Sequence, residues 1–149
     1  MFRVFALVCG ASGVSAYSNE PFFDTFEGEK LSDAWLVAHK QWGGSEAGSV
    51  VADNVAVRDG NLVLTAHGDL YDGPVRGINK DKSPRPDGRR TGGAIATTLY
   101  HASGSYEIRM KVAPTLGACS AIWTFHYEES TSGVRQTPRL RPLSEIYMQ

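Results

Sequence analysis

Cysteine is scarce in this sequence, and several other shortages narrow the class of protein. Only two cysteines, Cys9 and Cys119, occur in 149 residues, which is too few for a disulfide framework. Fifteen Lys and Arg against sixteen Asp and Glu leave a formal net charge of −1, without the positive excess of a nucleic-acid-binding surface. No apolar run is long enough to cross a bilayer as a helix. No stretch of about twelve residues has the apolar stripe of a capped helix, which argues against an α-helical domain.

The first sixteen residues have the pattern of a secretory signal peptide. Basic Arg3 precedes an apolar run from residue 4 to residue 14, and the small residues Val14-Ser15-Ala16 fit a cleavage site. We therefore expect cleavage after Ala16, leaving residues 17–149 as a secreted, extracellular domain without membrane attachment. The alternative is that the apolar run forms a buried N-terminal strand.

Neither the cysteines nor the histidines have the spacing of a catalytic or metal-binding site. Cys9 would leave with the signal peptide, and Cys119 adjoins an apolar run, so we expect a buried structural thiol. The four histidines are scattered through different segments: His39, His67, His101 and His126. No metal or other cofactor is predicted.

Apolar residues recur with period two along much of the chain, which predicts an all-β fold. In 105–112 the apolar side chains alternate with charged ones, so one face should be buried and the other solvated. Asp59-Gly60 has the residue types of a tight two-residue hairpin turn. We expect strands over 55–58, 61–66, 92–98, 105–112 and 121–127.

A long polar stretch, residues 69–90, interrupts the strands. Its part from 76 to 90 holds six Lys or Arg against two Asp, a local charge of +4. Such a charge run is typical of a solvated loop. The alternative is a loop that lines a ligand groove, because long loops in compact domains are often functional.

Aromatic residues are the first indication of a ligand. Flat rings on a β protein suggest sugar binding, although an aromatic residue in a strand more often belongs to the core. The candidates are Trp35, Trp42, Trp123, Tyr71, Tyr100, Phe125 and Tyr127.

Several short segments follow one another in an order found in one enzyme family. They are Phe22-Phe23-Asp24-Thr25-Phe26, Ala34-Trp35, Gln41-Trp42-Gly43-Gly44, the segment 53–64, Thr91-Gly92-Gly93-Ala94-Ile95, the segment 104–111 and Ala121-Ile122-Trp123-Thr124-Phe125. Together they resemble the N-terminal half of a family 16 glycoside hydrolase, of the laminarinase and lichenase group.

The resemblance implies a fold, an activity and a ligand. The fold is a jelly-roll (concanavalin-like) β-sandwich, and this chain would be incomplete at the C-terminus because 149 residues stop at or before the catalytic segment. The family activity is retaining hydrolysis of β-1,3 or mixed β-1,3/1,4-glucans without a cofactor, so β-glucan is the implied partner. By the same resemblance, Trp123, Asn54 and Trp42 match positions that line the family's substrate cleft.

The family's catalytic signature reads E-I-D-x-E, and the nearest counterpart here is the segment 145–149. On this alignment Glu145 occupies the nucleophile position, Tyr147 replaces the orienting Asp, and Gln149 replaces the acid/base Glu. An amide cannot exchange the proton that the leaving oxygen and water require, so we expect little or no hydrolysis. Residues 130–149 could instead be a tail unrelated to the signature.

Three interpretations therefore remain open. The chain is an active endoglucanase, a non-catalytic β-glucan-binding module, or a truncated product without independent function. The missing acid/base residue weighs against the first of these.

Overall fold

The computed structural model is built almost entirely of β-strands, so the chain is all-β. It describes residues 4–8, 17–18, 20–42, 48–101, 104–124 and 147–148. None of the helical segments in these ranges is long and apolar enough to span a membrane. The elements, in chain order, are β1 Val4–Val8, β2 Tyr17–Ser18, β3 Phe22–Asp24, β4 Trp35–Val37, β5 Lys40–Gln41, β6 Ser49–Val50, the 3₁₀ turn η1 Ala52–Asn54, β7 Val55–Arg58, β8 Asn61–Leu64, β9 Thr91–Gly92, β10 Ile95–Thr97, β11 Tyr100–His101, β12 Gly104–Ile108, β13 Ile122–Trp123 and β14 Tyr147–Met148.

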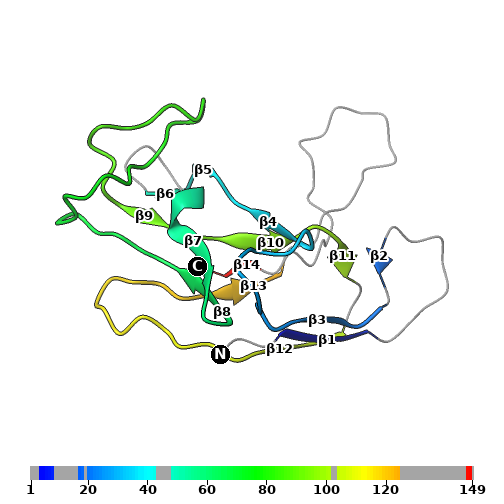
Figure 1. Cartoon of the computed structure of the whole chain (residues 1–149). Coiled ribbons are helices and arrows are strands. Elements are labelled where there is room, and N and C mark those ends of the chain that lie inside the picture. Colours follow the sequence, from blue (N-terminus) through cyan, green and yellow to red (C-terminus); the bar gives the residue numbers. More distant parts are fainter. Residues whose placement is uncertain are drawn as a thin grey trace, which may run out of the picture.

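The strands form several small sheets rather than one continuous one (Figure 1). The largest described sheet has the order β13-β14-β10-β4, and another has the order β12-β1-β3. Strands β5, β6 and β9 form a third, β7 and β8 pair as a hairpin, and β11 pairs in parallel with β2.

The predicted hairpin turn is confirmed. Asp59 and Gly60 adopt φ angles of +51° and +67°, and the flanking Arg58 and Asn61 are register partners. Positive φ at both central residues matches the right-handed twist of the strands that the turn joins. The second strand, however, ends at Leu64, two residues earlier than the sequence pattern indicated.

Strand β10 separates two packed clusters. Ile95 is fully buried and belongs to the main core with Phe26, Trp35 and Leu62. Its neighbours Ala94 and Ala96 belong to the second cluster, which also contains Ala38 and Val50. Because successive residues of a strand face opposite sides, Ile95 packs into the main core while Ala94 and Ala96 present small side chains to the other side.

Asp24 organises the main core near the end of β3. Its carboxylate accepts hydrogen bonds from the Phe26 N–H at 2.7 Å, the Ser32 hydroxyl at 3.0 Å and the Trp35 indole N–H at 2.7 Å. Phe26 has a φ of +55°, which is unusual for a bulky residue. The bond from its N–H helps to hold this conformation, while the buried Trp35 ring meets Phe22 edge-on at 5.3 Å.

The N-terminal segment forms the middle strand of its sheet. β1 pairs antiparallel with β12 on one side and with β3 on the other. The pairing of β1 does not decide between a signal peptide and a buried N-terminal strand, because the burial of its side chains lies outside what the structure describes. Processing after Ala16 stays a prediction.

The strand predicted over 105–112 is shorter than expected. β12 ends at Ile108, which is the register partner of Val4, the first residue of β1. The described part of β1 pairs with β12 no further than Ile108, and Val112, expected to be buried, is 55% exposed. The alternation of apolar and charged residues thus continues beyond the last residue of β12 that pairs with β1.

Two other strand predictions are corrected in part. The segment predicted as one strand over 92–98 is divided into β9 and β10, with a break at Gly93-Ala94. A Cβ at Gly93 would collide with the backbone oxygen of Asn54, so the chain can pass there only with glycine. Over 121–127 the structure has β13, and 125–127 lie outside the described residues.

Candidate functional site

Two tryptophans predicted to line a cleft lie against each other. The rings of Trp42 and Trp123 have centroids 5.7 Å apart and an interplanar angle of 66°, an edge-to-face contact. Both side chains are half-buried, so part of each remains accessible. The ammonium group of Lys40 lies 4.9 Å from the centroid of the Trp42 ring, which adds a cation–π contact.

Small residues make room for this aromatic pair. Trp42 and Trp123 pack against the second cluster, where Ala38, Ala94 and Ala96 provide the surface beneath them. Trp42 is also held by its backbone N–H, which donates to the oxygen of Gly48 at 3.0 Å. The two large rings thus pack over a cluster of small side chains and remain half-buried.

The C-terminal strand lies beside the tryptophan pair. β14 runs between β13 and β10, with residue 147 as the register partner of Trp123 and Met148 as the partner of both Ile122 and Ile95. The backbone at the position predicted for the orienting acid is therefore next to Trp123. Glu145 and Gln149, predicted for the nucleophile and acid/base positions, lie outside the described residues.

Asn54, the third predicted substrate-binding residue, has a structural contact. Its side chain is only 2% exposed, and its Nδ2 donates to the hydroxyl of Thr91 at 3.0 Å. Its backbone oxygen accepts the N–H of Thr65 at 2.9 Å. The structure thus brings Trp42 and Trp123 together and ties Asn54 to the strand end at Thr91.

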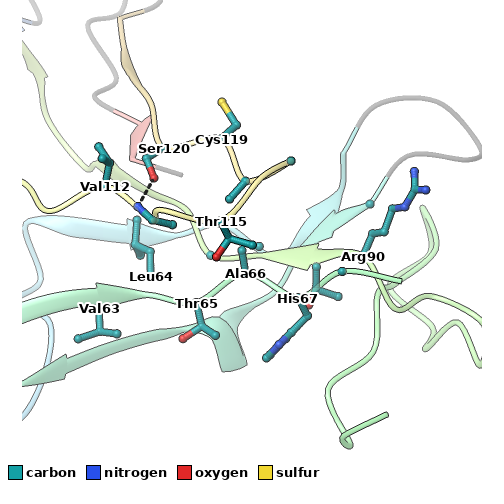
Figure 2. Close-up of a pocket in the computed structure, with 18 of the residues that line it drawn as sticks. Val63, Leu64, Thr65, Ala66, His67, Arg90, Val112, Thr115, Cys119 and Ser120 are labelled. Carbon is teal, nitrogen blue, oxygen red and sulfur yellow. Dashed lines mark hydrogen bonds between the residues drawn. The ribbon is translucent and has the colours of Figure 1, made fainter. Parts of the chain in front are cut away.

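Figure 2 shows part of an open groove of about 1270 Å³. Trp42 contributes to the lining of this groove. In Figure 2, residues 63–67 run along one side and residues of the 112–120 segment lie across from them. The groove combines apolar walls, such as Leu64 and Val112, with polar groups from His67, Asp69 and Arg90. The sequence left open that the 69–90 stretch lines a groove, and Asp69 and Arg90 of that stretch do line this one. The other walls were not identified from the sequence, because they come from segments far apart in the chain.

An ion pair and a ring stack form the polar end of the groove. Arg90 binds Asp69 through two bonds, Nε to Oδ1 at 2.6 Å and Nη2 to Oδ2 at 2.7 Å. This hydrogen bonding from Arg90 lowers the pKa of the Asp69 carboxyl. The His67 ring stacks on Tyr71 with centroids 3.7 Å apart, and burial lowers the pKa of this imidazole. At neutral pH this end therefore offers a paired carboxylate, a guanidinium and a neutral imidazole to a polar ligand.

The prediction of a buried thiol is wrong, since Cys119 is exposed. It lies in the segment after β12, where the chain turns at Thr115 and Gly117: the Ala118 N–H donates to the Thr115 oxygen at 3.1 Å, and Gly117 has a φ of +86°. The Ser120 hydroxyl accepts the Ala113 N–H at 3.3 Å and closes this turn on the surface. The apolar run after Cys119 therefore does not bury the thiol.

The described histidines have structural contacts of different kinds. His39 Nδ1 accepts the Ala52 N–H at 3.2 Å. His101 is 2% exposed and lies 5.4 Å from the Phe22 ring, and burial lowers its pKa. Across the described ranges, no group of three or more His, Cys, Asp or Glu could hold a metal ion.

No protein-family model, curated protein or solved structure matches this chain. The resemblance to family 16 glycoside hydrolases accordingly remains an interpretation of the sequence.

Proposed function

We propose that this chain is a family 16-like protein that binds β-1,3 or mixed β-1,3/1,4-glucan and does not hydrolyse it. The fold proposed with it is a concanavalin-like jelly-roll sandwich, and the proposed place of action is outside the cell. The observation that supports the proposal most is the edge-to-face pair of Trp42 and Trp123 on the small-residue side of β10.

This pair has the properties of a sugar-binding floor. Ligand sites are lined mainly by apolar and aromatic side chains, with a few polar groups that fix the orientation of the ligand. Here the two half-buried indoles supply the apolar surface, and the groove beside Trp42 supplies polar groups at Asp69 and Arg90. A glucan has both apolar C–H faces and many hydroxyls, so it matches such a combination.

The absence of hydrolysis follows from the chemistry of the C-terminal segment. Retaining hydrolysis needs one carboxylate to attack the sugar and a second group to protonate the leaving oxygen. If segment 145–149 is aligned with the signature, Glu145 supplies the first group and Gln149 stands where the second is required. Loss of general acid/base catalysis typically lowers the rate by about 10² to 10⁴. The phenol of Tyr147 also lacks the negative charge of the Asp that it replaces.

The experiment is affinity electrophoresis of the full chain in gels containing laminarin, lichenan or, as a control, the α-glucan dextran. Retardation by laminarin or lichenan and not by dextran is the expected result. Reducing ends are measured in parallel after long incubation with the same polysaccharides, and none above the buffer level is expected. Equal mobility in all gels would contradict binding, and release of reducing ends would contradict the loss of catalysis.

A further inference from the structure

The segment from 76 to 90, here called the basic lobe, concentrates positive charge on one part of the molecule. Its local charge is +4 in a chain whose formal net charge is −1. In Figure 1 this lobe is part of the green segment that projects at the upper left. Among its cationic residues, Lys80, Lys82, Arg89 and Arg90 are exposed.

The basic lobe has a fixed backbone. The Ser49 hydroxyl accepts the Ile78 N–H at 2.9 Å and donates to the Ile78 oxygen at 3.1 Å, and Ile78 itself is 4% exposed. The Gly77 N–H donates to the Gly88 oxygen at 2.7 Å, which joins the two ends of the lobe. Cations on a fixed backbone lose less conformational freedom on binding than cations on a flexible tail.

The acids of the lobe are engaged in local contacts. Asp81 accepts the Ser83 N–H at 3.0 Å and the Ser83 hydroxyl at 2.6 Å, which forms the turn at the tip. Asp87 lies 3.8 Å from the Arg85 guanidinium. Lys80 and Lys82 flank Asp81 in the sequence, so two exposed ammonium groups accompany one turn-forming carboxylate at the tip.

The lobe continues directly into the groove. Arg90, its last residue, lines the groove and is held there by Asp69. His67 lies at the same end in Figure 2, stacked on Tyr71, and the Arg76 guanidinium lies 5.9 Å from the centroid of the Tyr71 ring. A chain molecule that leaves the groove at this end therefore meets the positive charge of the lobe.

We infer that the basic lobe binds the anionic groups of a carboxylated or sulfated polysaccharide whose backbone occupies the groove. The inference rests on the proposed function for the saccharide in the groove and adds the charge of that saccharide. Charge complementarity favours an anionic chain over a neutral one. The apolar groove walls and the negative net charge favour a saccharide over nucleic acid.

The test compares binding of the full chain to laminarin, carboxymethyl-laminarin and sulfated laminarin of matched length. Both anionic forms are expected to bind about tenfold more tightly than laminarin at low salt, and about 0.5 M NaCl should remove that advantage because it screens exposed charges. The double variant Lys80→Gln/Lys82→Gln should lose about fivefold of the affinity for the anionic forms, since each exposed ion pair contributes little. Lys30→Gln, an exposed lysine outside the lobe, is the matched control and should have no effect.

The outcomes separate this inference from the proposed function. Laminarin binding with no gain from anionic groups, or a gain that the Lys80/Lys82 variant retains, overturns the inference and leaves the proposed function standing. Binding of the anionic forms alone, lost in the variant, supports the lobe and counts against binding of neutral glucan. Competition by duplex DNA as effective as that by the anionic saccharides, at equal charge, overturns the saccharide assignment.

Discussion

The indole rings of Trp42 and Trp123 meet edge to face at 5.7 Å, although Trp42 follows β5 and Trp123 lies in β13 of a different sheet. They do so because Ala94 and Ala96 leave space on one side of β10, while Ile95 fills the other side with the main core. One side of β10 thus faces the main core and the other faces the pair of Trp42 and Trp123. We propose that glucan binds on the side of this pair.

Trp42→Ala should weaken laminarin binding about 30-fold, which corresponds to the loss of about 2 kcal/mol for a tryptophan at the centre of an interface. Trp42→Phe is the matched variant, and it should retain most of the affinity because an aromatic face remains. Affinity electrophoresis with laminarin measures both, and thermal unfolding checks that the two variants are folded. Unchanged affinity in a folded Trp42→Ala protein would show that the pair is structural only.

Restoring the signature acids tests the alignment of the C-terminal segment. The double variant Tyr147→Asp/Gln149→Glu should gain slow hydrolysis of laminarin, because it restores the acid/base carboxyl and the orienting Asp, the latter at the register partner of Trp123. A third change, Glu145→Gln, should abolish the gained activity by removing the nucleophile. Reducing-end release measures all three proteins. A double variant that binds laminarin and stays inactive would indicate that residues 130–149 are unrelated to the signature.

Asp24→Ala should destabilise the protein by about 3 kcal/mol, because it leaves a buried indole N–H and a backbone N–H without their acceptor. The acceptor now serves Trp35 and Phe26, each at 2.7 Å. Glu29→Ala, at an exposed position nearby, should change the free energy of unfolding by less than about 0.5 kcal/mol. Urea denaturation of the two variants measures the difference, and equal stabilities would contradict this role of Asp24.

Stability should fall as the pH is lowered through the range in which His101 would titrate. Burial lowers the pKa of this imidazole below its usual value of 6.5, so the unfolded chain binds the proton more readily than the folded one. The stability that depends on neutral His101 is fully present above pH 6.5. It is lost as the pH falls toward the pKa that this imidazole has in the folded protein. His101→Phe should flatten the melting temperature between about pH 7.5 and pH 5, whereas His67→Gln should flatten it less because His67 is only half-buried. Thermal unfolding across this pH range measures the effect, and identical slopes for the wild type and His101→Phe would contradict it.

Local chemistry made part of the fold predictable. The turn at Asp59-Gly60 has positive φ at two adjacent residues, and Asp-Gly is a pair of residue types that favours this conformation. The all-β class followed from period-two alternation for the same reason, since alternation reports which face of a strand is buried.

Long-range pairing made the rest unpredictable. The alternation after Ile108 looked like a strand, but whether a strand forms depends on a partner, and β1 begins opposite that residue. The side-chain amide of Asn54 donates to Thr91 of a distant segment, a contact that no local pattern indicates. The groove, the Asp69–Arg90 pair and the exposure of Cys119 all depend on how such segments pack, which no local pattern reports.

Binding without cleavage is measured in one experiment by a fluorescence titration of the full chain with laminarin, with reducing ends assayed in the same samples. Trp42 and Trp123 form the proposed floor, so we expect a saturable change in tryptophan emission that Trp42→Ala shifts to about 30-fold higher laminarin concentration, together with no release of reducing ends. A flat titration of the folded wild-type protein, or steady accumulation of reducing ends, would contradict the claim that this chain binds β-glucan without cleaving it.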